Sequence, residues 1–190
     1  MKNIKKILEN NNVILKGHFL LTSGLHSDIY FEKFRLLENP NLVKKLIKTK
    51  EKELQNLNVT LCIGPLTGGA LVAFAVGDIL NIRSIYMEKE ENEFVLKRDF
   101  KIYKEDKILL CDDVLTTGSS FLKMRKSLAP YLNQIVGHFV LIDRSTEAIE
   151  EISPVISVYR EPAVTYTAEE CPLCKMGIPV EKRGGSKITP

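Results

Sequence analysis

The chain has 190 residues, 44% of them hydrophobic, with a formal net charge of +3. This length can bury one sizeable core, so we expect a single domain over residues 1–190 with appendages. No stretch approaches the roughly 18 apolar residues of a membrane span, and the N-terminus lacks the apolar segment of a signal peptide. We therefore expect a cytoplasmic protein that binds no membrane. The 27 basic residues are nearly balanced by 24 acidic ones, which does not indicate a nucleic-acid-binding face.

The apolar pattern predicts strands that alternate with helices. The first patterned segment, His18–Phe34, is predicted to form short strands or loop around a turn, outside the central sheet. Runs that are apolar on both faces, as in covered strands, are Thr60–Ile63, Ile108–Cys111 and Ile135–Ile142. Helical periodicity occurs in Pro40–Leu57, Gly69–Leu80 and Ser119–Leu132. This alternation predicts an α/β fold with an open, mostly parallel sheet flanked by helices.

One central segment, Glu88–Lys107, is dense in both acidic and basic residues. It contains one alternating, strand-like piece at Phe94–Lys97. Charge content of this kind is typical of a solvated surface, and the segment is predicted to form a hairpin.

The run Ile108–Ser120, ILLCDDVLTTGSS, carries the clearest chemical signal. Ligands of open parallel sheets bind beyond the carboxyl ends of the strands, where Asp112 and Asp113 fall. Residues 114–120 supply backbone N–H groups, hydroxyls and a glycine before a helix, which suits a phosphate. The aspartates suit hydroxyl groups or a hard cation such as Mg²⁺. The run therefore predicts a sugar-phosphate site, against the alternative of an ordinary strand-to-helix turn with an N-cap.

This run resembles the 5-phosphoribosyl 1-diphosphate (PRPP) binding motif of type I phosphoribosyltransferases. Further segments, in the same order along the chain, look like orotate phosphoribosyltransferase: residues 17–36, 63–76, 86–100, 141–145 and 170–187. The resemblance implies transfer of the phosphoribosyl group of PRPP to orotate, which gives orotidine 5′-monophosphate and diphosphate in pyrimidine (UMP) biosynthesis. It also implies Mg²⁺ as cofactor and a homodimer with a shared active site.

The resemblance implies the type I phosphoribosyltransferase fold, which is Rossmann-like, with its core over residues 58–145. A small hood would come from about residues 1–36 and 160–190. A mobile loop over residues 88–107 would close over PRPP and exclude water from the reacting centre.

For PRPP, the resemblance implies that Asp112 and Asp113 bind the ribose hydroxyls, and Asp113 is also a candidate catalytic residue. The metal would have no direct protein ligand, since Mg²⁺ would be carried by PRPP near these two aspartates. The 5′-phosphate would be wrapped by the loop of Val114, Leu115, Thr116, Thr117, Gly118, Ser119 and Ser120. The diphosphate would face Thr67 and Gly68, and some relatives carry lysine at the position of Gly68.

In the charged segment, Lys89 matches a family lysine that binds PRPP and acts in catalysis, often in the neighbouring subunit. Asn92 and Phe94 replace basic residues of the relatives' loop. Lys97 and Arg98 are therefore the further catalytic candidates, as cations that neutralise the diphosphate.

For orotate, Arg144 matches the arginine that meets the carboxylate, a pairing that guanidinium geometry favours. Thr116 would also lie near orotate. Tyr30 and Phe31 match an aromatic pair that packs against the orotate ring. The alternative for these two is a pair of core-facing aromatic residues in a strand.

The histidines and cysteines give weaker signals. Cys62 and Cys111, in apolar runs, are predicted to be buried. His18, His26 and His138 are predicted to form no ligand cluster with the cysteines, and His138 is predicted to be a core residue. Cys171 and Cys174 have zinc-knuckle spacing without a second pair nearby. Two such pairs meeting across a dimer is one alternative, and a structural tail or thiols without a ligand is the other.

Two other functions remain open from the sequence. One is a phosphoribosyltransferase for another base, which would keep the PRPP motif and change the base-binding residues. The other is a non-catalytic regulator that senses PRPP.

Overall fold

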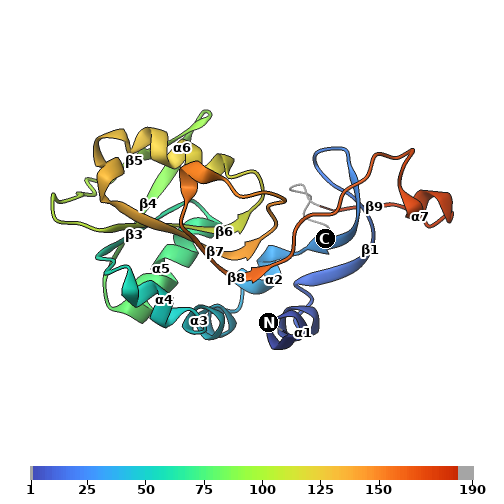
Figure 1. Cartoon of the computed structure of the whole chain (residues 1–190), viewed down its shortest axis with the longest axis horizontal. Helices are drawn as coiled ribbons and strands as arrows, with labels where there is room; N and C mark the ends of the chain where they lie inside the picture. Colours follow the sequence, from blue (N-terminus) through green and yellow to red (C-terminus); the bar gives the residue numbers. More distant parts are fainter. Residues whose placement is uncertain (1, 184–190) are drawn as a thin grey trace. The chain divides into compact units, whose positions relative to one another are not determined.

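The computed structural model describes residues 2–183, and the predicted tail residues 184–190 lie outside this range (Figure 1). The chain forms two compact units. The described part of unit 1 comprises residues 2–35 and 163–183, and unit 2 comprises Leu36–Pro162. Within residues 2–183, no helix is both long enough and apolar enough to cross a membrane.

Unit 2 is built on a six-stranded sheet with the strand order β5-β4-β3-β6-β7-β8. The strands are β3 Leu61–Pro65, β4 Arg83–Glu90, β5 Glu93–Leu96, β6 Ile108–Leu115, β7 Ile135–Asp143 and β8 Val155–Arg160. All neighbours pair in parallel except β5, which pairs antiparallel with β4 as a hairpin. The predicted α/β fold with a mostly parallel sheet is therefore confirmed.

Helices cover both faces of this sheet. Figure 1 shows α6 Ser119–Ser127 on one face and α5 Gly68–Leu80, with α3 Pro40–Lys48 and α4 Glu51–Asn56, on the other. Unit 2 also contains the 3-10 helices η1 Ala129–Gln134 and η2 Glu150–Ile152, and α2 Lys33–Leu37 spans the point where the chain passes from unit 1 to unit 2. Pro40 begins α3, and the side chain of Asn39 caps it by accepting a hydrogen bond from the Leu42 N–H at 3.1 Å. The stretch predicted as one helical segment, Pro40–Leu57, is thus two helices.

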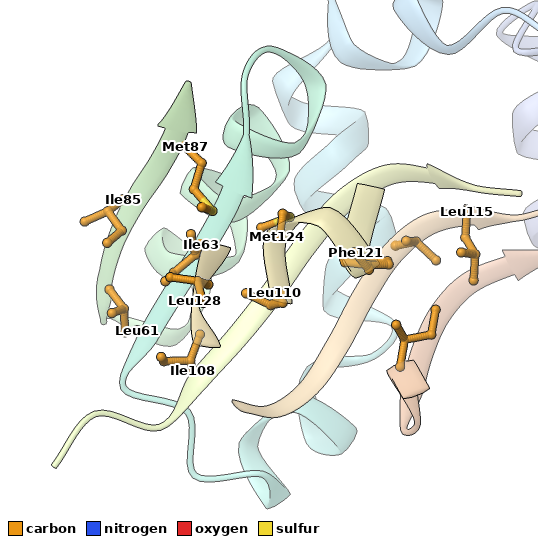
Figure 2. Close-up of a cluster of buried hydrophobic side chains, with 12 residues drawn as sticks. Leu61, Ile63, Ile85, Met87, Ile108, Leu110, Leu115, Phe121, Met124 and Leu128 are labelled. Carbon is orange, nitrogen blue, oxygen red and sulfur yellow. The ribbon is translucent and has the colours of Figure 1, made fainter. Parts of the chain in front are cut away.

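The core of unit 2 on the α6 side is a cluster of buried aliphatic and aromatic side chains (Figure 2). Alternate residues of each strand face this cluster because strand side chains point to opposite faces in turn. Phe121 and Met124 of α6 pack onto these residues, and both are at most 1% exposed. Cys62 and Cys111 have no exposed surface, which confirms their prediction as buried residues. This packing fixes the start of α6 at the end of β6.

Unit 1 contains a separate three-stranded sheet in the order β2-β1-β9. Its elements are α1 Lys2–Asn10, β1 Ile14–Leu20, β2 His26–Phe31, α7 Pro172–Lys175 and β9 Glu181–Lys182. β1 and β2 form an antiparallel hairpin, with a register irregularity between Lys16 and Phe19. The short strands predicted around a turn in His18–Phe34 are therefore confirmed, and they lie outside the six-stranded sheet.

The C-terminal segment of unit 1 is held against β2 by backbone pairing. The N–H groups of His26 and Tyr166 each donate to the other residue's carbonyl, at 2.8 and 2.9 Å. The Ser27 hydroxyl donates to the Val164 carbonyl at 2.8 Å. The hairpin and the chain's last described segment are thus one folded piece.

Candidate functional site

The phosphate-binding candidate is the connection from β6 to α6. β6 runs to Leu115, α6 begins at Ser119, and Gly118 between them has φ +74°. The positive φ favours glycine, and a Cβ here would lie 2.7 Å from the Cδ1 of Ile149, which would have to move. The first turn of α6 leaves backbone N–H groups without helical partners, which suits an anion.

The side chains of this loop divide into two groups. Thr116, Thr117 and Ser119 are exposed, so their hydroxyls are available to a ligand, and Ser120 is half-buried. Leu115 is only 4% exposed and belongs to the hydrophobic core. A contact between Leu115 and PRPP would therefore be made by its backbone. The loop and Asp112 line a small hollow of about 20 Å³, which is room for roughly one water-sized group.

Asp112 and Asp113 lie within β6 and not after it, because the strand continues to Leu115. Both side chains are buried, at 7% and 5% exposed. The Asp112 Oδ1 accepts a hydrogen bond from the Asp113 N–H at 2.8 Å, which orients the first carboxylate along the strand. Two buried carboxylates therefore lie on β6 shortly before the β6–α6 loop.

The carboxylate of Asp113 lies against the first residue of α5. A Cβ built on Gly68 would be 1.9 Å from the Asp113 Oδ2 and 2.6 Å from its Cγ. Gly68 begins α5, and Thr67 before it is exposed. The peptide bond between Leu66 and Thr67 is cis. The structure thus brings Gly68, one of the two predicted diphosphate-facing residues, to Asp113, although the two lie far apart in sequence.

Arg144 follows β7 at the same edge of the sheet. Its backbone N–H donates to the Leu115 carbonyl at 2.8 Å, which joins the end of β7 to the end of β6. The side chain is 9% exposed, and this burial lowers the pKa of the guanidinium, while the charge of Glu161 acts in the opposite direction. Arginine stays protonated in spite of such a shift. Arg144 is therefore a buried positive charge that follows β7 and is joined by its backbone to the start of the β6–α6 loop.

A cleft of about 380 Å³ opens at this edge, beside the ends of β6, β7 and β8. Its polar lining includes Asp143, Ser145 and Arg160. Asp143 accepts hydrogen bonds from the N–H and the hydroxyl of Ser145, at 2.9 and 2.6 Å, and pairs with Arg160 at 3.2 Å. These contacts fix the wall of the cleft. Asp143 and Ser145 flank Arg144 in a segment that the sequence analysis singled out, but it gave them no role. Arg160 was not found, because only the strand order brings β8 beside β7.

The charged segment forms the β4–β5 hairpin followed by an irregular stretch. Lys89 lies on β4 opposite Phe94 of β5 and is exposed. Lys97 pairs with Glu90 at 2.6 Å, and Arg98 pairs with Glu88 at 2.8 Å. The two candidate diphosphate cations are therefore bound to acidic groups of their own hairpin in this conformation. The roles of Lys89, Lys97 and Arg98, and the mobility of the segment, stay predictions.

Tyr30 and Phe31 lie on β2 of unit 1. The Tyr30 ring is half-buried with its centroid 5.6 Å from that of Phe19, and burial is the main cause that raises the pKa of its hydroxyl. Phe31 is 7% exposed, which leaves little of its ring for a ligand. Their predicted packing against orotate stays a prediction.

Two of the three histidines do cluster with cysteines, contrary to our prediction. The ligand atoms of His18, His26, Cys171 and Cys174 all lie within 4.8 Å of one another in unit 1. The sequence analysis missed this cluster because about 150 residues separate the histidines from the cysteines. Only the spacing of the CPLC pair indicated a possible metal site. His138 is instead 1% exposed in β7, which confirms its prediction as a core residue.

Comparison with known proteins finds phosphoribosyltransferases by family model, by sequence and by structure. Residues 35–167 match the family model of the phosphoribosyl transferase domain. The chain is 34% identical over 185 residues to the orotate phosphoribosyltransferase of Caldanaerobacter subterraneus subsp. tengcongensis, with 97% of each chain covered. It is 34% identical over 192 residues to that of Desulforamulus reducens, with 96% of each covered. The crystal structure of orotate phosphoribosyltransferase from Aeropyrum pernix superimposes with a TM-score of 0.63 at 25% identity, covering 82% of this chain and 92% of that one.

Proposed function

Because the chain belongs to the orotate phosphoribosyltransferase family, we propose that it transfers the phosphoribosyl group of PRPP to orotate and releases orotidine 5′-monophosphate and diphosphate. The observation that carries the proposal is the convergence at one sheet edge of the β6–α6 loop, the two aspartates, Gly68 and Arg144. Each of these groups suits one part of the two substrates.

In this proposal the exposed hydroxyls of Thr116, Thr117 and Ser119, with the N-terminal N–H groups of α6, bind the 5′-phosphate. The carboxylates of Asp112 and Asp113 accept hydrogen bonds from the ribose hydroxyls. Because both carboxylates are buried and held by β6, the sugar is positioned with little loss of side-chain freedom on binding.

The diphosphate leaves as the bond to the ribose carbon breaks, and the transition state has oxocarbenium character. The turn at Thr67 and Gly68 offers backbone N–H groups and one hydroxyl to this anion. Since Asp113 contacts Gly68, the ribose-binding carboxylate and the diphosphate-binding turn are set at a fixed separation. Lys89, Lys97 and Arg98 would add positive charge, the last two after exchanging Glu90 and Glu88 for the diphosphate.

Mg²⁺ belongs to the proposal as the cation carried by PRPP. The negative charges of Asp112 and Asp113 suit a hard cation that PRPP carries near the ribose, without a direct protein ligand. When bound, the ion neutralises part of the negative charge of the diphosphate.

Arg144 is proposed to bind the orotate carboxylate. A guanidinium with low exposure gains more from a carboxylate than an exposed one does, because water competes less. A base without the carboxylate would leave this charge without its ligand, so orotate is favoured over uracil or a purine. A homodimer with a shared active site and a cytoplasmic location complete the proposal.

The purified chain with PRPP, Mg²⁺ and orotate should consume orotate, followed by its absorbance, while uracil, hypoxanthine and adenine are not used. No consumption of orotate at ample enzyme would refute the proposal. Consumption of a purine instead would indicate a transferase for another base, and PRPP binding without any turnover would indicate a regulator.

The role of Arg144 has its own test. Arg144→Ala should raise the KM for orotate about 10- to 100-fold, since a charged hydrogen bond contributes about 1.5–3 kcal/mol. The dissociation constant for PRPP should change less than about threefold. Arg125→Ala, which removes a half-buried arginine from the last turn of α6, is the matched control and should change neither value. Equal loss of both substrates in Arg144→Ala contradicts the assignment.

A further inference from the structure

Unit 1 contains a cluster of soft ligands that the transferase reaction does not use. His18 lies on β1, His26 begins β2, Cys171 is the N-cap of α7, and Cys174 lies within α7. The first three side chains are buried, at 4%, 7% and 0% exposed, and Cys174 is half-buried. We propose that these four residues bind one structural Zn²⁺ ion.

The distances fit tetrahedral coordination. Cys171 Sγ and Cys174 Sγ lie 3.4 and 3.6 Å from His18 Nε2, and Cys174 Sγ lies 3.3 Å from His26 Nδ1. Zinc bonds of about 2.0–2.1 Å to nitrogen and about 2.3 Å to sulfur require N···S edges of about 3.5 Å. The two ring nitrogens, at 2.8 Å, are closer than the roughly 3.3 Å of an ideal N···N edge. A small separation of the two rings would bring this edge to the tetrahedral value, and all four ligand atoms already lie within 4.8 Å of one another.

The hydrogen bonding of the His18 ring suits metal binding. Its Nδ1 lies 2.7 Å from the carbonyl oxygen of Ile178. A carbonyl only accepts hydrogen bonds, so Nδ1 carries the proton and Nε2 presents its lone pair to the cluster. Metal-binding histidines are held in this way by a hydrogen bond from the other ring nitrogen.

The local backbone structure explains why the two histidine side chains lie on the same side of the hairpin. The register irregularity in β1 places Gly17 and His18 opposite the single residue Asp28, as in a β-bulge, which redirects side chains. Leu20 pairs with His26, so His18, two residues before Leu20, is a diagonal neighbour of His26 on the same face. Gly177, with φ +68°, turns the chain after α7 and brings the Ile178 carbonyl back to His18.

The donor set selects the metal. Two sulfurs and two imidazole nitrogens suit Zn²⁺, whereas Mg²⁺ and Ca²⁺ prefer oxygen and iron–sulfur clusters commonly use thiolates. On binding, both cysteine thiols lose their protons to water and the histidines stay neutral, so Zn²⁺ with two thiolates has no net charge. A neutral site is compatible with burial. All four positions are filled by protein, which is typical of structural zinc and leaves no place for a substrate.

The ion would fasten the two separated parts of unit 1. The ligand pairs in contact are 148 to 156 residues apart in sequence. A unit with so few residues has a small core, and closing a loop of this length lowers the entropy of the unfolded chain. The C-terminal segment around α7 is thereby held on the β1–β2 hairpin.

The test uses the untagged full chain, produced with added zinc and purified under reducing conditions. Elemental analysis should find about one zinc per chain, and less than a tenth of that in Cys171→Ser and Cys174→Ser. Cys62→Ala, which removes a buried thiol in β3, is the matched control and should retain the ion. A chelator should lower the thermal unfolding midpoint of the parent chain and leave that of the serine variants unchanged.

Substitution of zinc by Co²⁺ reports the coordination geometry. A variant that keeps four ligands separates loss of the site from misfolding of the serine variants. The parent chain reconstituted with Co²⁺ should show the intense ligand-field bands of tetrahedral cobalt and a thiolate charge-transfer band. Cys174→His keeps four ligands and should bind the ion with the charge-transfer intensity reduced to about half. The proposal is overturned by a parent chain without stoichiometric metal, by serine variants that retain it, by octahedral cobalt spectra, or by a Cys171–Cys174 disulfide under the reducing conditions.

Discussion

Gly68→Ala tests the contact that joins the two halves of the proposed PRPP site. The new Cβ would lie 1.9 Å from the Oδ2, 2.6 Å from the Cγ and 3.2 Å from the Cβ of Asp113. The first two distances are far inside van der Waals contact, and the carboxylate is buried in β6. The alanine must therefore displace either the carboxylate or the start of α5.

Overpacking of this kind costs about 1–3 kcal/mol of unfolding free energy. Asp113→Ala removes the two closest atoms and leaves only the contact at 3.2 Å. In that background the same glycine substitution should cost less than about 1 kcal/mol, since alanine also favours the helix by up to about 1 kcal/mol. The expected coupling between the two positions is therefore about 1–3 kcal/mol.

Urea unfolding of the four chains of this cycle, followed by circular dichroism, measures the coupling. Gly137→Ala is the control, because the nearest atoms to its Cβ would be the Leu57 Cδ1 at 3.0 Å, the Leu109 Cδ1 at 3.6 Å and the Pro154 Cγ at 3.7 Å, none of which belongs to Asp113. Its cost should be the same with and without Asp113→Ala. Gly68→Ala should also weaken PRPP binding. An equal cost of Gly68→Ala in both backgrounds would show that the contact with Asp113 does not constrain the site.

Three further predictions concern the rest of unit 2. Burial lowers the pKa of His138 to about 4, whereas its pKa in the unfolded chain is near 6.5. Between these pH values the unfolded state binds more protons than the folded state, so the free energy of unfolding decreases as the pH falls. The loss from pH 7 to pH 5 should be about 2 kcal/mol in urea unfolding and should be smaller in His138→Gln; parallel curves for both chains would exclude this residue as the cause. Asp106 is 7% exposed and accepts hydrogen bonds from the Thr60 hydroxyl, the Tyr103 N–H and Arg83, at 3.1, 2.8 and 3.3 Å. Asp106→Ala should therefore lower the free energy of unfolding by about 2–4 kcal/mol. Glu53→Ala, which breaks an exposed pair with Lys50, should lower it by under about 1 kcal/mol. Similar costs for these two variants would contradict the role of burial. Lys89→Ala should lower kcat at least about tenfold, since loss of a charged contact to the transition state costs about 1.5 kcal/mol or more. Lys104→Ala, in the same charged segment, is the control. An unchanged kcat in Lys89→Ala would show that Lys89 does not act in catalysis.

Sequence periodicity found the elements whose local pattern is strong. β3, β6 and β7 are buried on both faces, so their apolar runs are nearly continuous, and the helical stretches between them are long. β4 and β8 were missed because they carry weaker patterns. β4 ends in the charged segment, and β8 is an edge strand in which only Val158 and Tyr159 are buried. The break between α3 and α4 also has no proline or glycine to mark it.

The sequence by itself determined the α/β class, the glycine- and hydroxyl-rich loop between β6 and α6, and the position of Arg144 at a strand end. These features depend on neighbouring residues, and the order of a few adjacent side chains encodes them. Only the tertiary structure decided three others: the contact of Gly68 with Asp113, the pairing of Lys97 and Arg98 with hairpin acids, and the meeting of His18 and His26 with Cys171 and Cys174. Each joins residues brought together by strand pairing or helix packing, and a one-dimensional pattern carries no distance between them.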